Sequence, residues 1–590
     1  MMKPRLAAGA AKIIDGVARA LARFPLAVLS ALVTLGVLLV VVEMKGDAEW
    51  PWQRVALAVA LGVPLGVFIV IAGESRGWVR SRIWLLQALG SILLAGYWAT
   101  LPAEDGGVPD SVWVRTVVIA LALHLGVASG ARHGSQRAFW SFNWVLFSRF
   151  WLGVLYAVVF FAGLALAMSS AAQLFEFELE SDRYMQLWLL VTVGFHPLFL
   201  LAGVPRTAAG EQAELEPSRG LRIFAGGVLL PLAVVYLGIL YPYAIKIAVV
   251  HRWPEGWVAA PVLGLAVVGL LAVLLLAGTG LRWAEIFTRW FARLLVPMAG
   301  LLAFAVLERV NDYGLTESRY AGLVLAGWLV VIGVYFGTGE VARRSLRLIP
   351  VSLCILCAVA AAGPVGLFAV AERSQLARLD RLLTSHGLLE AGVMHPKPQV
   401  LSGEDYTSLR STMDYLQRRH RSAGMHARLA LWLKTEPAKR TDRWGFGEEV
   451  CQWLKVTGGD RSNNEHFQLL ATNLTTDGFG SAAYIEMRSW SKESPEADGV
   501  KLRISSDRKA VEMEMGDRWE EVAAINAGLR DHVFVAGKVK NMGQGTITVD
   551  VALSSGEKRR LVILAAEGQG WLLPEAAIEL ERVNVLVLVP

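Results

Sequence analysis

The chain has 590 residues, of which 54% are hydrophobic, and a mean hydropathy of +0.46, which is more apolar than the core of a soluble protein requires. This excess predicts an integral membrane protein whose partners include membrane lipids. The net charge of +6 does not indicate a nucleic acid partner, because the basic residues before position 373 lie in short clusters between apolar runs.

Residues 1–24 carry several basic residues ahead of an apolar stretch over 25–42. That stretch is too long for a signal-peptide core and has no small-residue cleavage site that fits one. We therefore interpret residues 1–24 as a cytoplasmic amphipathic segment and the following stretch as a retained first span.

Apolar runs long enough to cross a membrane recur up to residue 373 and predict a transmembrane domain over 25–373. The expected spans, about eleven in number, lie near 25–43, 54–73, 83–101, 112–131, 150–172, 184–204, 223–245, 256–278, 291–308, 319–338 and 348–371. Two stretches that mix aromatic and basic residues, 137–144 and 282–291, are typical either of interfacial helices or of aromatic belts at helix ends.

The positive charges favour one orientation. Arginines gather in alternate connections, for example at 76–82, 132–149 and 343–347, whereas acidic residues gather in the others, as at 104–105 and 176–182. Cytoplasmic loops retain positive charge, so we expect a cytoplasmic N-terminus in the bacterial cytoplasmic (inner) membrane. With an odd number of spans, the C-terminal domain is expected to be extracytoplasmic.

Polar groups at membrane depth are costly and suggest function. His124 and His196 are the deepest, although each is also explained by a hydrogen bond to a neighbouring helix. Cys354 and Cys357 have metal-site spacing but lack suitable neighbours, so we interpret them as packing residues. We predict no metal site and no cofactor, because no phosphate-binding loop, zinc motif or dinucleotide fingerprint is present.

A charged, tyrosine-rimmed cluster is predicted at the outer ends of the late spans, where it would suit a lipid headgroup or another anion. Its candidate ligand-binding residues are Tyr241, Tyr243, Lys246, Glu308, Arg309, Asn311, Asp312, Tyr313, Thr316, Glu317 and Arg319. The alternative is a structural turn that joins two spans, with Gly314 in a conformation that other residues resist.

Three motifs in this region resemble a bacterial membrane family known as domain of unknown function 4153. They are Tyr241–Lys246 with Trp253–Val258, Glu308–Tyr320 with its Tyr-Gly-Leu-Thr-Glu-x-Arg-Tyr core, and Arg373–Leu379. The resemblance covers residues 25–425. It departs from the family at Pro242 and at His251-Arg252, and it implies a topology but no activity.

Residues 374–590 predict a small soluble α+β domain, helical over 374–460 and β-rich over 461–590. Leu376, Leu379, Leu382 and Leu383 fall at helical spacing. Strands are expected near 467–470, 483–487, 500–504 and 510–515, and 534–539 and 545–551 are expected to form a hairpin. The whole chain thus predicts an α-helical polytopic membrane bundle followed by an extracytoplasmic α+β domain.

Three functions fit these patterns. The first is a carrier or lipid-handling protein with an outer-leaflet polar site. The second is a membrane-anchored sensor or envelope assembly factor that binds a protein partner through residues 374–590. The third is a membrane enzyme acting on a lipid-linked substrate, with Glu308, Asp312 or Glu317 as acid or base.

Overall fold

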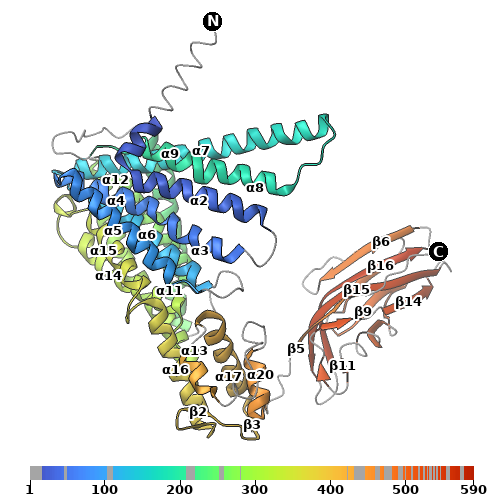
Figure 1. Ribbon diagram of the computed structural model, residues 1–590. Helices are drawn as coiled ribbons and strands as arrows, with labels where there is room; N and C mark the ends of the chain where they lie inside the picture. Colours follow the sequence, from blue (N-terminus) through green and yellow to red (C-terminus); the bar gives the residue numbers. More distant parts are fainter. Residues whose placement is uncertain are drawn as a thin grey trace. The chain divides into compact units, whose positions relative to one another are not determined.

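We describe the chain from a computed structural model (Figure 1). The structure describes residues 16–589 except 45–48, 103–109, 207–218, 251–257, 280, 421–422, 431–445, 459–464, 471–480, 489–495, 498–499, 506–508, 516–517, 523–524, 528, 530–533, 536–537, 540–541, 545–546, 553–557 and 572–576.

The chain forms two compact units. The first contains residues 1–394 and 412–447, and the second contains residues 395–411 and 448–590. The boundary that we predicted after residue 373 lies inside the first unit, because the helix that follows the last apolar run packs on the bundle. Each unit is described by itself below.

The first unit is a bundle of helices in which residues 16–23 are also helical (Figure 1). In chain order its helices are α2 (Pro25–Glu43), α3 (Glu49–Ala60), α4 (Gly62–Ser75), α5 (Arg80–Ala99), α6 (Asp110–Gly130), α7 (Gln136–Leu174), α8 (Ser181–Leu189), η1 (Leu190–Phe195), α9 (His196–Leu201), α10 (Arg219–Phe224), η2 (Ala225–Leu229), α11 (Leu230–Val250), α12 (Ala259–Ala277), α13 (Arg282–Tyr313), α14 (Glu317–Gly337), η3 (Val341–Arg343), α15 (Leu348–Ala361) and α16 (Leu367–Ser385).

Shorter elements follow these helices. They are β1 (Leu389–Glu390), β2 (Val393–Met394), β3 (Gln399–Leu401), α17 (Gly403–Tyr415), η4 (Leu416–His420), α18 (Ala423–Arg428), α20 (Phe446–Leu454) and β4 (Val456–Gly458). α16 buries Leu379 and Leu383, which confirms the predicted helix with its apolar stripe.

Nine helical stretches among the described residues are long and apolar enough to cross a membrane. They coincide with nine of the predicted spans, and the chain is a multi-pass membrane protein. The predicted span at 83–101 corresponds to α5, a helix of 20 residues that is not one of the nine. The total of eleven therefore stays a prediction.

The extent predicted for the last span, 348–371, is wrong. α15 has 14 residues and ends at Ala361, and α16 begins at Leu367. Gly363 lies between them with a φ of +83°, a backbone conformation that side chains with a Cβ resist, and Pro364 follows it. Apolar composition concealed this break, because Gly and Pro are frequent in membrane helices.

Two of the membrane helices contain a π-helical turn. η1 comes just before His196-Pro197, and η2 comes just before Leu230-Pro231. Proline lacks a backbone N–H and its ring crowds the preceding turn, and a widened turn is one way in which a helix accommodates it.

The close approach of α13 and α14 builds the largest apolar core of the bundle, which includes Leu295, Met298 and Leu302 from α13. α14 presents Gly333 and Gly337 to its partner. A Cβ on Gly333 would lie 2.8 Å from the carbonyl oxygen of Ala292, so only glycine permits this spacing. Small residues four apart are a usual device for packing helices in lipid, where apolar burial itself supplies no preference.

The β-rich part of the second unit has two main sheets with a shared apolar core. One sheet has the order β13 (Met542–Gln544), β5 (Glu465–Leu470), β15 (Lys558–Trp571), β16 (Ala577–Val589), β6 (Ser481–Arg488), and β14 (Ile547–Ala552) also pairs with β15. The other has the order β10 (Arg518–Glu521), β9 (Val511–Met515), β8 (Val500–Ile504), β7 (Glu496–Ala497).

The hairpin predicted between 534–539 and 545–551 is wrong. Residues 534–539 pair with themselves, as β11 (Phe534–Val535) and β12 (Lys538–Val539), whereas β14 pairs with β15 from Ile547↔Ile563 to Ala552↔Lys558. The longer ladder with β15 gives every residue of β14 a partner. The four other predicted strands correspond to β5, β6, β8 and β9.

We expect Gly333→Leu to destabilise the bundle, because the new side chain meets the backbone of α13, and overpacking of this kind costs about 1–3 kcal/mol. The measurement is the thermal unfolding midpoint of the protein in mild detergent. Gly327→Leu is the matched control, since Gly327 lies on the same helix and a Cβ on it would meet nothing within 4 Å. Equal midpoints for the two variants would refute the glycine contact.

Candidate functional site

The turn between α13 and α14 contains the predicted cluster's central residues. Gly314 has a φ of +73°, and its carbonyl oxygen accepts a hydrogen bond of 2.7 Å from Nη1 of Arg319. The Arg319 guanidinium also lies 5.4 Å from the centre of the Tyr313 ring. The Thr316 and Ser318 hydroxyls are 3.3 Å apart. Arg319 and Tyr313 thus stabilise the turn itself.

α16 holds this turn from the other side. Gln375 is 3% exposed and donates through Nε2 to the carbonyl oxygens of Tyr313 and Leu315, each at 3.1 Å. The backbone N–H of Leu315 donates to Oγ of Ser374 at 3.1 Å. A Cβ on Gly314 would come within 2.8 Å of Nε2 of Gln375. Two of the three motifs therefore interlock, and the requirement for glycine is both conformational and steric.

Glu317 begins α14 and faces the segment after α17. Its Oε2 accepts a hydrogen bond of 2.5 Å from the Tyr415 hydroxyl, and its Oε1 lies 3.2 Å from Nε2 of His420. The side chains of His420 and Glu317 are only 4% and 13% exposed. Burial and the hydrogen bond to Glu317 raise the pKa of Tyr415, which keeps the hydroxyl a neutral donor.

Of the remaining predicted residues, Tyr241 lies away from the turn, whereas Glu308, Arg309 and Asn311 belong to the last turns of α13 just before it. The Tyr241 hydroxyl donates to the Leu294 carbonyl oxygen at 2.9 Å, and Leu294 is 17 residues before Asn311 on α13, roughly 25 Å along the helix. Tyr243 packs against the apolar core. Lys246, Glu308, Arg309 and Asn311 are exposed. The Asp312 side chain and the motif residues 251–257 lie outside the described residues. Among the described side chains, the contacts within the cluster run from Tyr313 to Arg319, and Arg309 is near enough to act on Arg319 through its charge.

The two deep histidines bond to helix backbone. Nε2 of His196 lies 3.3 Å from the Phe150 carbonyl oxygen of α7, and Gly153 leaves the space for its ring. Nδ1 of His124 lies 2.7 Å from the carbonyl oxygen of Ala120 one turn earlier. Cys354 likewise donates to the Ala122 carbonyl oxygen of α6.

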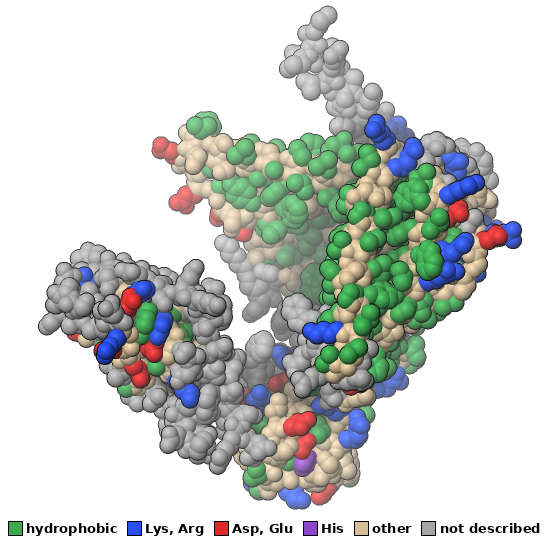
Figure 2. Space-filling view, turned by 180° about the vertical axis from the view of Figure 1, so that it is seen from behind, with side chains coloured by type: hydrophobic (Ala, Val, Ile, Leu, Met, Phe, Trp, Pro, Cys, Tyr) green, Lys and Arg blue, Asp and Glu red, His purple; other side chains and the backbone are tan. Residues whose placement is uncertain are grey.

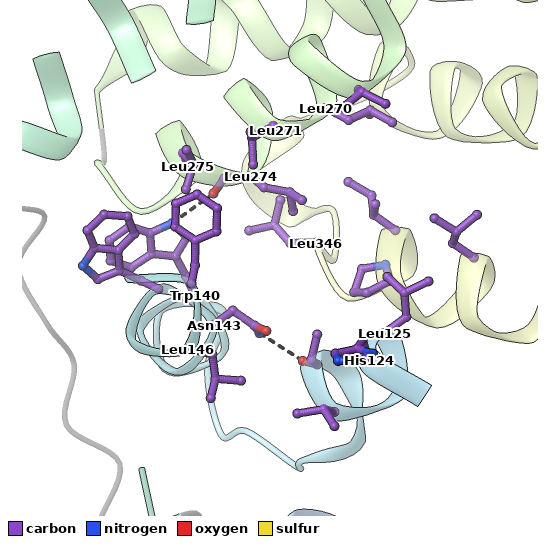
Figure 3. A pocket seen from close by; sticks show the side chains of 18 of the residues that line it. His124, Leu125, Trp140, Asn143, Leu146, Leu270, Leu271, Leu274, Leu275 and Leu346 are labelled. Carbon is purple, nitrogen blue, oxygen red and sulfur yellow. Dashed lines mark hydrogen bonds between the residues drawn. The ribbon is translucent and has the colours of Figure 1, made fainter. Parts of the chain in front are cut away.

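A cavity of about 630 Å³ lies in the bundle between α6 and α7 on one side and α12, α14 and α15 on the other (Figure 3). Leucine is the commonest residue of its apolar wall, as at Leu270, Leu271, Leu274 and Leu346. The size and the apolar lining are those of a site for a hydrophobic ligand.

The polar groups in the cavity wall are bonded to the protein. Asn143 donates through Nδ2 to the carbonyl oxygens of Ala128 and Phe139, each at 3.0 Å, and Nε1 of Trp140 donates to Leu274 at 3.0 Å (Figure 3). His124 also lines the cavity, and its Nδ1 lies 2.7 Å from the carbonyl oxygen of Ala120 (Figure 3). This wall offers a solute few free hydrogen-bonding groups.

A second hollow of about 460 Å³ adjoins this cavity, and Trp140 and Leu346 line both. Its polar lining includes Gln136, Arg137, Glu285 and Arg344. Gln136 donates to the Arg344 carbonyl oxygen at 2.6 Å and accepts from the Leu346 N–H at 3.1 Å, which ties the start of α7 to the connection before α15.

Sequence reasoning did not identify the cavity. The stretch 137–144, interpreted as an interfacial helix or as an aromatic belt at a helix end, forms the first turns of α7 and contains Trp140, Asn143 and Trp144. Trp140, Trp144 and Phe147 stack in succession at spacings of four and three, so an aromatic stripe on one helical face was the available signal.

Comparisons with known proteins agree with the resemblance. The family model described as "Domain of unknown function (DUF4153)" matches residues 23–388. An uncharacterised protein of Pasteurella multocida is 29% identical over 233 residues, which are 38% of this chain and 38% of that protein. The similarity thus spans well under half of that relative. No solved structure matches the chain.

We expect Tyr415→Phe to loosen η4, because it removes a hydrogen bond to a charged group, worth about 1.5–3 kcal/mol. Local opening frees the helical backbone at Arg418 and Arg419 of η4, so tryptic cleavage there should accelerate roughly tenfold, as followed by mass spectrometry. Tyr313→Phe is the control, because it deletes the same hydroxyl from a ring that is 59% exposed. Indistinguishable cleavage of the two variants would argue against the Glu317 contact.

Proposed function

The chain belongs to the DUF4153 family, and from this premise we propose that it is a lipid-handling membrane protein that holds an acyl chain in the leucine-lined cavity. The observation that carries the proposal is the cavity itself, about 630 Å³ of apolar space that opens at the surface of the apolar bundle. An apolar occupant would stabilise this space, because the side chains of its wall then regain van der Waals contacts that an unfilled space does not give them.

The chemistry of the wall favours a lipid over a polar solute. A polar solute loses its hydration on entry and needs replacement hydrogen bonds, whereas Asn143 and Trp140 already bond to backbone carbonyls. An acyl chain needs only contact with leucine side chains. Its affinity then depends on shape, because lipid tails are as apolar as the cavity wall.

The adjoining hollow supports an amphiphilic ligand. A lipid with its chain in the apolar cavity would pass Trp140 and Leu346 and bring its headgroup toward Gln136, Arg137 and Arg344. Arginine forks suit the oxygens of a phosphate or carboxylate. Glu285 in the same lining would repel an anion and restricts where its charge can lie.

The orientation is part of the proposal. Figure 2 shows several Lys and Arg side chains gathered at the upper end of the apolar bundle. We infer that this end faces the cytoplasm of a bacterial cell and that the α13–α14 turn faces the opposite side of the inner membrane.

Filling the cavity should displace the lipid. We expect Ala128→Trp with Leu271→Trp to reduce the population of lipid-bound protein severalfold in native mass spectrometry from mild detergent, because both residues line the cavity. Leu121→Trp with Leu166→Trp is the control, since these leucines are exposed on the outside of α6 and α7. Equal lipid retention by the two double variants would refute the site.

Cysteine labelling tests the orientation. With a membrane-impermeant maleimide applied to cells whose outer membrane is permeabilised, Ser318→Cys should react at once, because Ser318 is exposed in the first turn of α14. Arg343→Cys should react only after the inner membrane is disrupted. The reverse pattern would invert the proposed topology.

A further inference from the structure

Another hollow, of about 640 Å³ and different from the one next to the leucine-lined cavity, lies at the arginine-rich end of the bundle. Residues 19–25, the end of α4, the start of α5 and residues 201–206 surround it. Its charged lining consists of Arg19, Arg23, Glu74, Arg80 and Arg206. It shares no lining residue with the leucine-lined cavity, so it is a separate site.

Arg23 and Glu74 form the fixed base of this hollow. The Arg23 guanidinium binds the Glu74 carboxylate through two hydrogen bonds of 2.8 and 2.7 Å. It also donates to the carbonyl oxygens of Val204 and Pro205, at 2.5 and 2.8 Å. Glu74 is the only carboxylate among the described lining residues, and this pair neutralises it.

Three further arginines give the hollow a net positive charge. Arg19, Arg80 and Arg206 are exposed, and Arg80 uses one Nη2 contact of 3.2 Å on the Ala22 carbonyl oxygen. A guanidinium carries five N–H donors, so Arg80 retains most of its hydrogen-bonding capacity for a ligand.

Gln87 adds a buried polar group. It is 5% exposed and lines the hollow, and its Oε1 accepts a hydrogen bond of 3.2 Å from the Leu26 N–H. Its amide nitrogen has no hydrogen-bond partner among the residues that the structure describes. A buried amide donor that lines a cationic hollow is suited to an anionic oxygen.

We propose that this hollow binds a phosphate ester, with Arg80 and Arg206 on its oxygens and the Gln87 amide as an additional donor. Trp78, Ile83 and Trp84 line the apolar part of the hollow. Beyond Trp84, the exposed side chains Leu85, Leu89 and Ile92 continue along α5. A phospholipid headgroup and a small soluble phosphate ester share the chemistry of this site, and the apolar surface of α5 would add contacts only for the lipid.

The experiment titrates the full-length protein in an uncharged detergent, by isothermal calorimetry, with dihexanoyl phosphatidylglycerol and separately with glycerol 3-phosphate. Each titration is repeated with Ala128→Trp/Leu271→Trp, so that lipid entering the leucine-lined cavity is recognised. Saturable binding that persists in this variant belongs to the arginine hollow. The proposal thus stands or falls independently of the acyl-chain site.

Arg80→Gln with Arg206→Gln should weaken binding at least tenfold, and Gln87→Leu should weaken it severalfold without a change in charge. Arg282→Gln with Arg343→Gln is the matched control. It removes two charges from exposed arginines that do not line the hollow. This control should bind within about twofold of the unaltered protein.

Binding of both ligands with these losses supports a phosphate site open to soluble esters, and binding of phosphatidylglycerol alone supports a lipid headgroup site. Two results overturn the proposal. One is the absence of saturable binding by the unaltered protein, and the other is equal weakening by the control pair, which indicates diffuse surface charge. Thermal unfolding midpoints identify any variant that fails to fold, and Gln87→Leu then provides the test.

Discussion

The contact between α13 and α14 is the constraint on which most of the first unit depends. In lipid, helices gain little from burying apolar surface, and association rests on close packing and on hydrogen bonds between helices. Gly333 brings the backbones together, and Arg293 donates to the Gly337 carbonyl oxygen at 2.8 Å. This pair then provides the Leu294 carbonyl that accepts from Tyr241, the turn that Gln375 holds, and the cavity wall at Trp328 and Leu329.

The helical architecture was predictable because the apolar runs and the charged residues between them indicate the same limits for the spans. A run of apolar residues must form a helix in lipid, where every backbone N–H and carbonyl needs a partner within the segment. Nine predicted runs accordingly coincide with helices of spanning length. A turn at Gly314 was also predictable, since the residues Tyr313-Gly314-Leu315-Thr316 lie in a short polar connection between two apolar runs. The positive φ of Gly314 and the hydrogen bond from Arg319 agree with the turn interpretation, and ligand binding by these residues stays a prediction.

What escaped prediction depends on partners that are distant in sequence. Nothing near Glu317 in the sequence indicates a contact with Tyr415 or His420, which lie about a hundred residues later. The hydrogen bond from Gln375 to the turn likewise joins residues that are far apart in the sequence. β15 and β16 were not predicted, although Val583, Val585 and Val587 alternate in β16. Alternation indicates a strand, but by itself it does not say which strand pairs with which. The false hairpin at 534–551 has the same origin.

The polar motif and the ligand-sized spaces occupy different places, and this separation bears on where function lies. The side chains of Arg319, Gln375 and Glu317 all make contacts within the protein, so the motif shapes the turn. The cavity wall begins on α14 at Leu325, eight residues from Glu317 and roughly 12 Å along the helix. Residues that face lipid and residues that face the cavity are equally apolar. A cavity of this kind therefore cannot be predicted from the sequence, whereas a turn can, because glycine and polar residues interrupt the apolar runs there. The side chains of Arg319, Gln375 and Glu317 bond within the protein, and the leucine-lined cavity is therefore the place that we propose for the ligand.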